Sequence, residues 1–83
     1  MVPLLRYFAA IRAEAGVSEE QVTGSTLQEV LATARDARGA RFAEVLGVCS
    51  FLVDGDPVGG REHEHVQVGA GSTVDCLPPF AGG

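Results

Sequence analysis

The segment that runs from residue 25 to residue 39 limits the possible folds more than any other part of the sequence. The pair Ser25-Thr26 provides a cap hydroxyl, and Gln28-Glu29 follows three residues later, which is the capping-box pattern that begins a helix. Arginines in the last turn suit the negative end of the helix dipole, and Gly39 is a natural stop. The apolar residues recur with a helical period and form one face: Leu27, Val30, Leu31 and Ala34. The sequence therefore predicts one amphipathic helix over residues 26–38.

Short apolar runs on both sides of this helix predict β-strands. In the last of them Val74 and Cys76 point to one face of the sheet, and Thr73, Asp75 and Leu77 point to the other. "AAIRAEAG" predicts a turn or short helical loop that ends at Gly16, and "ARFAEVLG" a second short helical turn. The expected strands cover residues 2–8, 20–23 and 48–53, a brief stretch from 58, and residues 72–77.

The order of these elements predicts an α+β protein with a β-grasp (ubiquitin-like) fold, in which one main helix packs across a mixed sheet. A ferredoxin-like split βαβ fold is the alternative, and it needs a second full helix before the last strand. The stretch "GGREHEHVQVGAG" is polar and rich in glycine, so it predicts a loop instead. Eighty-three residues suffice for one domain, which we expect over residues 1–79, with an extended tail at 80–83.

Composition and charge narrow the possible partners and locations. The net charge of −5 argues against nucleic acid and anionic membranes as partners. The longest apolar run, residues 45–53, is far short of the ~20 residues of a membrane helix. Arg6 interrupts the N-terminal apolar stretch too early for a secretory signal, so a cytoplasmic protein is expected. All six basic residues are arginines, and the sequence contains no lysine with which to form an isopeptide or a Schiff base.

Three motifs with possible chemistry are weighed against simpler explanations. Cys49 and Cys76 fit no metal-binding spacing, and in a reducing compartment they are expected to be buried thiols. His63 and His65 lie on one side of an extended segment, but no third or fourth zinc ligand is evident, so no metal site is predicted. Gly59-Gly60 is followed by neither a helix start nor a lysine, and a phosphate-binding loop is rejected.

The sequence ends in "LPPFAGG", which is its strongest functional signal. Pro78 and Pro79 stop the last strand and favour an extended exit from the domain. Phe80, Ala81, Gly82 and Gly83 would then span about 13 Å at ~3.3–3.6 Å per residue. Two residues without Cβ atoms pass a constriction that rejects any other residue. The reactive group would be the α-carboxylate of Gly83, which is inert until a partner activates it.

This tail on a small β-grasp resembles the MoaD/ThiS sulfur-carrier family, whose typical member is the small subunit of molybdopterin synthase. "VPLLRYFAAIRAEAG" resembles the family's first strand and following loop, and "STLQEVL" its helix start. "FLVDGDPV" is similar to its third strand and turn, and "GSTVDCLPPFAGG" to its last strand and tail. The loop "GGREHEHVQVGAG" departs from the pattern, because "AGSTV" stands where a shorter "DGDEV"-like turn is usual.

The resemblance implies a carrier that is not itself an enzyme and binds no cofactor. An E1-like enzyme of the MoeB type would use ATP to adenylate the Gly83 carboxylate, and a sulfur donor protein would convert it to a thiocarboxylate. The tail, residues 80–83, would then insert into a large synthase subunit of the MoaE type and supply sulfur to molybdopterin. By matching positions, Phe8, Pro57 and Leu77 would form an apolar docking patch on the exposed face of the sheet; ordinary core or incidental surface residues are the alternative.

Three other functions stay open at this stage. The same chemistry serves carriers for thiamine thiazole, cysteine or another sulfur metabolite. A ubiquitin-like modifier would instead join Gly83 to a target lysine, although the absence of lysine here forbids lysine-linked chains of the protein itself. A β-grasp interaction module with an incidental tail is the third possibility.

Overall fold

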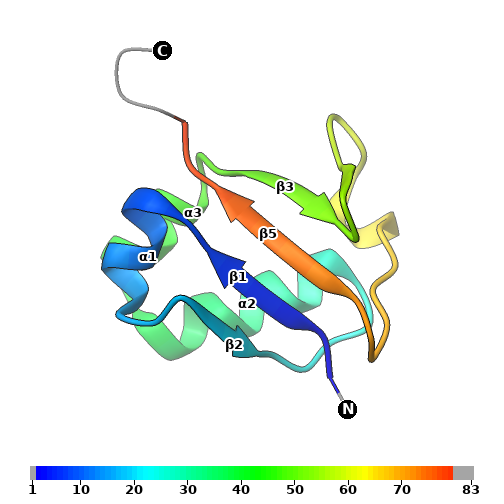
Figure 1. The fold of residues 1–83 in the computed structure, drawn as a ribbon, viewed down its shortest axis with the longest axis horizontal. Helices are drawn as coiled ribbons and strands as arrows, with labels where there is room; N and C mark the ends of the chain where they lie inside the picture. The colour runs from blue at the N-terminus through cyan, green and yellow to red at the C-terminus, as the bar shows by residue number, and fades with distance from the viewer. Residues whose placement is uncertain (1, 80–83) are drawn as a thin grey trace.

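A computed structural model describes residues 2–79. The chain forms a five-stranded sheet with helices packed against it (Figure 1). The elements in order are β1 (Leu4–Tyr7), α1 (Ala9–Ala15), β2 (Glu19–Gln21), α2 (Leu27–Arg38), α3 (Ala40–Leu46), β3 (Ser50–Val53), β4 (Asp56–Pro57), the 3₁₀ helix η1 (His63–His65) and β5 (Thr73–Leu77).

The sheet has the strand order β2-β1-β5-β3-β4. The first and last strands, β1 and β5, lie side by side in the centre and are parallel, whereas every other pair is antiparallel. In Figure 1 the strands lie in front of α2, which crosses behind them, and α1 and α3 lie at one end. This arrangement is the β-grasp that the order of elements predicts.

Alternation along the strands sends one set of apolar side chains to the helix-covered face of the sheet. Val74 and Cys76 are fully buried on β5, whereas Thr73, Asp75 and Leu77 are only partly buried, as the sequence predicts. On β1, Leu5 and Tyr7 are buried in the same way. The helices add the other large side chains of this core: Ile11, Leu27, Val30, Leu31, Phe42 and Leu46.

The predicted capping box begins α2. The backbone N–H of Glu29 donates to the Thr26 hydroxyl at 3.2 Å, so Thr26 is the N-cap residue. The Glu29 carboxylate in turn accepts from the backbone N–H of Ser25 at 2.8 Å and lies 2.9 Å from its hydroxyl. These bonds lower the pKa of Glu29. Gly24 precedes the cap because a Cβ there would lie 2.9 Å from the backbone nitrogen of Val30.

Several strand boundaries differ from the sequence prediction: β1 is Leu4–Tyr7 instead of residues 2–8, and β2 is Glu19–Gln21 instead of residues 20–23. The third strand begins at Ser50, not at Val48, because the backbone N–H groups of Val48 and Cys49 bond back to the end of α3. Val48 is consequently 62% exposed. The brief strand after the "DG" turn is Asp56–Pro57 and ends before Val58. The turn itself matches, since Asp54 and Gly55 both have positive φ, at 50° and 86°.

The loop over residues 59–71 is more ordered than its polar composition predicts. Val66 and Val68 are buried, and Val66 accepts the backbone N–H of Leu27 at 2.8 Å while Val68 donates to Ser25 at 3.1 Å. The segment therefore satisfies backbone groups at the start of α2. His63–His65 forms one turn of 3₁₀ helix, so the expectation of an extended segment with both imidazoles on one side is wrong.

Candidate functional site

The face of the sheet opposite α2 contains the residues predicted to dock a partner. Pro57 is exposed there, and Phe8 and Leu77 are half-buried. The strand register places Leu52 between Pro57 and Asp75. We call this surface the open face and define it by seven side chains: Leu4 and Arg6 of β1, Phe8 directly after β1, Leu52 of β3, Pro57 of β4, and Asp75 and Leu77 of β5.

An ion pair lies at the centre of the open face. Arg6 and Asp75 are register partners of the parallel strands, and Arg6 Nε lies 2.8 Å from Asp75 Oδ1. The Arg6 guanidinium also lies 5.5 Å from the centre of the Phe8 ring, which is cation–π geometry. The surface is therefore an apolar patch with a charged centre. Sequence reasoning missed this pair because the register of two strands 69 residues apart has no local signal.

The open face borders the point from which the chain leaves the domain. Since β1 and β5 are parallel, Phe8, which follows β1, and Leu77, the last residue of β5, lie at the same end of these two strands. Pro78 is buried and Pro79 is exposed directly beyond it. The predicted reactive residue Gly83 and the predicted threading residues Phe80, Ala81 and Gly82 lie outside the described residues. The structure does describe the open face, which lies beside Pro79, the last described residue before that segment.

The two cysteines have the properties of packed thiols. Cys76 is fully buried, and burial strongly raises its pKa. Cys49 is half-buried, donates to the carbonyl of Val45 at 3.3 Å, and has its pKa raised by burial to about 11. Both groups are protonated at neutral pH, and a thiol is a far weaker nucleophile than a thiolate.

The histidines of η1 do not gather metal ligands. His63 packs edge-on against Phe51, with ring centres 5.4 Å apart. Among residues 2–79, no three histidine, cysteine, aspartate or glutamate side chains lie close enough together to hold a metal ion. Within that same range, no helix has the length and hydropathy needed to cross a membrane.

A polar network ties the helices to the sheet on the covered side. Two Arg38 nitrogens donate to the Glu20 carboxylate at 2.6 and 3.0 Å, and a third donates to the carbonyl of Ala15. The Tyr7 hydroxyl donates to the same carboxylate. The hydrogen bonds from Arg38 lower the pKa of Glu20, whereas burial, followed by Glu20, raises the pKa of Tyr7. This network positions the end of α1, β2 and the end of α2, and no sequence motif indicates it.

Fold and surface together define a ubiquitin-like β-grasp domain, with an apolar face next to the point where the chain leaves the sheet. The model of the ThiS family matches residues 5–83. The chain therefore belongs to the ThiS family of ubiquitin-like sulfur carriers. No curated protein sequence matches it significantly.

Solved structures with the same fold come from several biological settings. Small archaeal modifier protein 1 from Methanosarcina acetivorans superposes with a TM-score of 0.82 and 21% identity, over 98% of this chain and 95% of that one. The BexX/CysO complex from Amycolatopsis orientalis superposes with a TM-score of 0.81 and 18% identity, over 99% of this chain and 100% of that one. The complex of subunits 1 and 2 of the molybdopterin-converting factor from Helicobacter pylori superposes with a TM-score of 0.71 and 22% identity, over the full length of both chains. At these identities the likeness establishes the fold alone.

Proposed function

We propose that the chain is the sulfur-carrying small subunit of molybdopterin synthase, with Gly83 as the residue that carries sulfur. The observation that supports this most strongly is the match of the ThiS family model through residue 83, because it includes the Gly-Gly segment that β5 leads into. The family provides the class of carrier, and the molybdopterin branch is our proposal.

The proposed chemistry occurs on the Gly83 carboxylate, and a partner supplies the catalytic groups. The carboxylate attacks the α-phosphorus of ATP in the active site of an E1-like enzyme, and pyrophosphate leaves. The terminal sulfur of a persulfide on the donor protein then attacks the acyl carbon and AMP leaves, which gives an acyl disulfide. A second thiol reduces this disulfide, forms a disulfide with the donor cysteine and releases the thiocarboxylate. Gly82 and Gly83 suit this route, since residues without Cβ pass through a narrow channel. The protonated, buried thiols of Cys49 and Cys76 fit a carrier better than a catalyst.

We assign the open face to docking of the activating enzyme and of the large synthase subunit. Phe8 and Leu77 border the base of the segment 80–83, so a partner that binds this segment lies directly over them. Pro57 and Leu52 extend the apolar surface across β4 and β3. Aromatic residues and arginine are enriched at protein–protein interfaces, and Phe8 and Arg6 provide both on this face.

The choice of pathway rests on the tail and on one neighbour. The sequence "PPFAGG", with its two prolines, resembles the molybdopterin branch, and the Helicobacter pylori neighbour is a subunit of the molybdopterin-converting factor. Carriage of sulfur for thiamine thiazole, cysteine or another metabolite is the first alternative, which the CysO neighbour favours. Protein modification is the second, which the small archaeal modifier protein favours.

Intact-mass spectrometry tests the carrier function. Incubation with ATP, a sulfur donor and the E1-like enzyme of the source organism should add about 16 Da, because sulfur replaces one carboxylate oxygen. A chain that stays unmodified with every E1-like enzyme of that organism would contradict the proposal. Addition of the large synthase subunit and its pterin precursor then tests the branch: molybdopterin should form, whereas covalent attachment to other proteins would indicate a modifier.

A further inference from the structure

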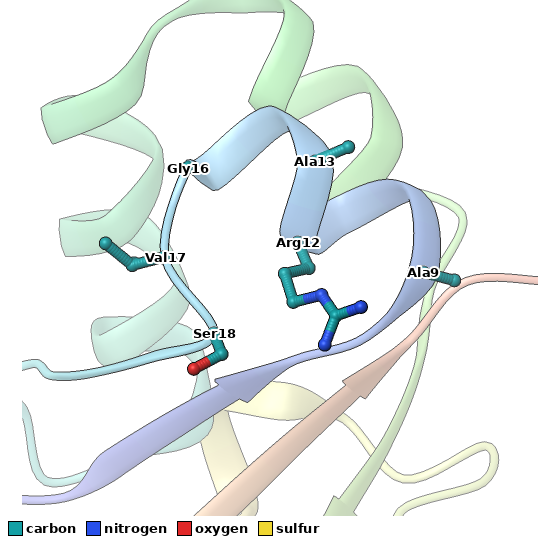
Figure 2. Close-up of a pocket in the computed structure, with 6 residues that line it drawn as sticks. All are labelled: Ala9, Arg12, Ala13, Gly16, Val17 and Ser18. Carbon is teal, nitrogen blue, oxygen red and sulfur yellow. The ribbon is translucent and has the colours of Figure 1, made fainter.

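A depression beside α1 has a distinctive lining. It has a volume of about 370 Å³ and is lined by Ala9, Arg12, Ala13, Gly16, Val17 and Ser18. Figure 2 shows the Arg12 side chain extending from α1 into the space between this helix and β1, with Ser18 across the opening. Val17 is 42% exposed, which makes it one of two large apolar side chains exposed among the described residues. A cation thus lies in a shallow surface depression whose other lining residues are small or apolar.

Arg12 differs from most arginines of this acidic protein. Arg6, Arg38 and Arg41 each pair with a carboxylate of the chain itself. Arg61 donates to two backbone carbonyls. The Arg12 side chain makes no hydrogen bond or ion pair with any residue from 2 to 79, although the sequence contains 11 acidic residues and only 6 basic ones. Its guanidinium is therefore available to an external anion.

The depression lies at the end of the sheet where partners must bind if the proposed function is correct. One side of the depression is α1, which follows β1 directly. The other side is the loop over residues 16–18, where the carbonyl of Ser18 accepts the backbone N–H of Tyr7. Both sides therefore lie at the C-terminal end of β1. Because β5 is parallel to β1, the chain continues toward Gly83 from this same end. An enzyme that holds the segment 80–83 in its active site therefore approaches the end of the sheet that carries Arg12.

We propose that the Arg12 depression receives a carboxylate side chain of the E1-like adenylating enzyme. This inference rests on the proposed function and adds a specific contact to it. A planar guanidinium presents a fork of donors that matches a carboxylate. A charged contact at the rim of an apolar interface fixes orientation and raises the association rate more than it raises affinity.

The test compares two arginines that both lack a partner among the described residues. Arg35 is partly buried on α2, behind the sheet in Figure 1, and serves as the control for a charge reversal away from the depression, with its thermal unfolding measured alongside. Binding of the full-length chain to the E1-like enzyme of the source organism is measured for the wild type, Arg12→Glu, Arg12→Gln and Arg35→Glu. We expect Arg12→Glu to weaken binding at least tenfold and Arg12→Gln about two- to fivefold, with Arg35→Glu within about twofold of the wild type.

Salt dependence and charge exchange give independent readouts. Wild-type affinity should fall as sodium chloride is raised, and Arg12→Gln should make this dependence shallower. Replacement of the E1-like enzyme's carboxylate residue that contacts Arg12 by arginine should restore binding of the Arg12→Glu variant. Thermal unfolding of both Arg12 variants should match that of the wild type, because the side chain is exposed and unpaired within residues 2–79.

Two outcomes would overturn the inference, and they differ in what they say about the proposed function. If Arg12→Glu and Arg12→Gln bind like Arg35→Glu while the wild type still acquires sulfur, the depression is not a contact and the carrier function stands. If the wild type neither binds any E1-like enzyme nor gains about 16 Da, the proposed function fails and the inference fails with it.

Discussion

The two faces of the sheet are built from alternate residues of the same strands, yet they differ in almost every property. The covered face is apolar and buried, with Val74 and Cys76 both fully enclosed on β5. The open face has half-buried Leu77 and Phe8 around an ion pair. A change at an even-numbered residue of β5 and a change at an odd-numbered one therefore test different functions of one strand.

The ion pairs of the two sides show the same difference. On the covered side, Arg38 and Glu20 are 21% and 27% exposed and share their bonds with Tyr7 and the end of α1. On the open face, Arg6 is 45% exposed and, within residues 2–79, pairs with Asp75 and lies over the face of the Phe8 ring. The first pair joins three elements of the fold, whereas the second is available to a partner. We infer that stability depends on the covered side and docking on the open face.

Val74→Glu should have the largest effect. Val74 is fully buried, so the substitution places a carboxylate without a partner in the core. A loss of more than about 4 kcal/mol is expected, which approaches the whole stability of a small domain. Circular dichroism should show an unfolded chain at 25 °C. A folded variant with an unchanged melting temperature would contradict the assignment of this face.

Leu77→Glu is the matched change on the open face of the same strand. The variant should stay folded, because Leu77 is only partly buried and points away from the core. Its affinity for the E1-like enzyme should fall by more than about tenfold, or ≥2 kcal/mol, as at an interface hot spot. Normal binding by a folded variant would show that the open face is not the interface. An unfolded variant would show that the two faces do not divide stability and docking.

Glu20→Gln tests the network on the covered side. Loss of the charge that Arg38 binds should lower the free energy of unfolding by about 1–2 kcal/mol at pH 7. The pKa of Glu20 is lowered in the folded protein, so its contribution is present above the ordinary value of about 4.3 and is lost as the pH falls through the folded value. Urea unfolding at several pH values should therefore show the two proteins converging below about pH 4. A difference that stays constant down to pH 2 would rule out the ionised pair as its cause.

Asp75→Asn should have the smallest effect on stability. The pair with Arg6 is largely solvated on the arginine side, and exposed pairs contribute about 0–1 kcal/mol. We expect a melting temperature within about 5 °C of the wild type. A loss as large as that of Glu20→Gln would mean that the open face also supports the fold.

The sequence predicts much of this molecule because its signals are local. The capping residues and apolar period define α2, and alternation along residues 73–77 assigns each side chain of β5 to its face. The "DG" turn predicts the β3–β4 hairpin, since both residues adopt positive φ. Each of these signals lies within a few residues of the structure that it determines.

The features that sequence reasoning missed depend on contacts between distant segments. Val48 belongs to an apolar run, but the end of α3 holds its backbone and leaves its side chain exposed. The spacing of Val66 and Val68 is a two-residue alternation that a polar composition hides, and its significance depends on the start of α2 lying beside it. The pairs Arg6–Asp75 and Arg38–Glu20 likewise arise only after the sheet and helices have assembled.

The most direct test of the account is to locate the added sulfur within the chain. Trypsin cleaves after arginine, and because the last basic residue is Arg61, digestion leaves residues 62–83 as one peptide. After reaction with ATP, the E1-like enzyme and a sulfur donor, that peptide alone should gain about 16 Da, and deletion of Gly83 should abolish the gain without changing the melting temperature. A gain that occurs without ATP, or that persists in the Gly83 deletion, would indicate oxidation of Cys76 or another side chain and would contradict the carrier function.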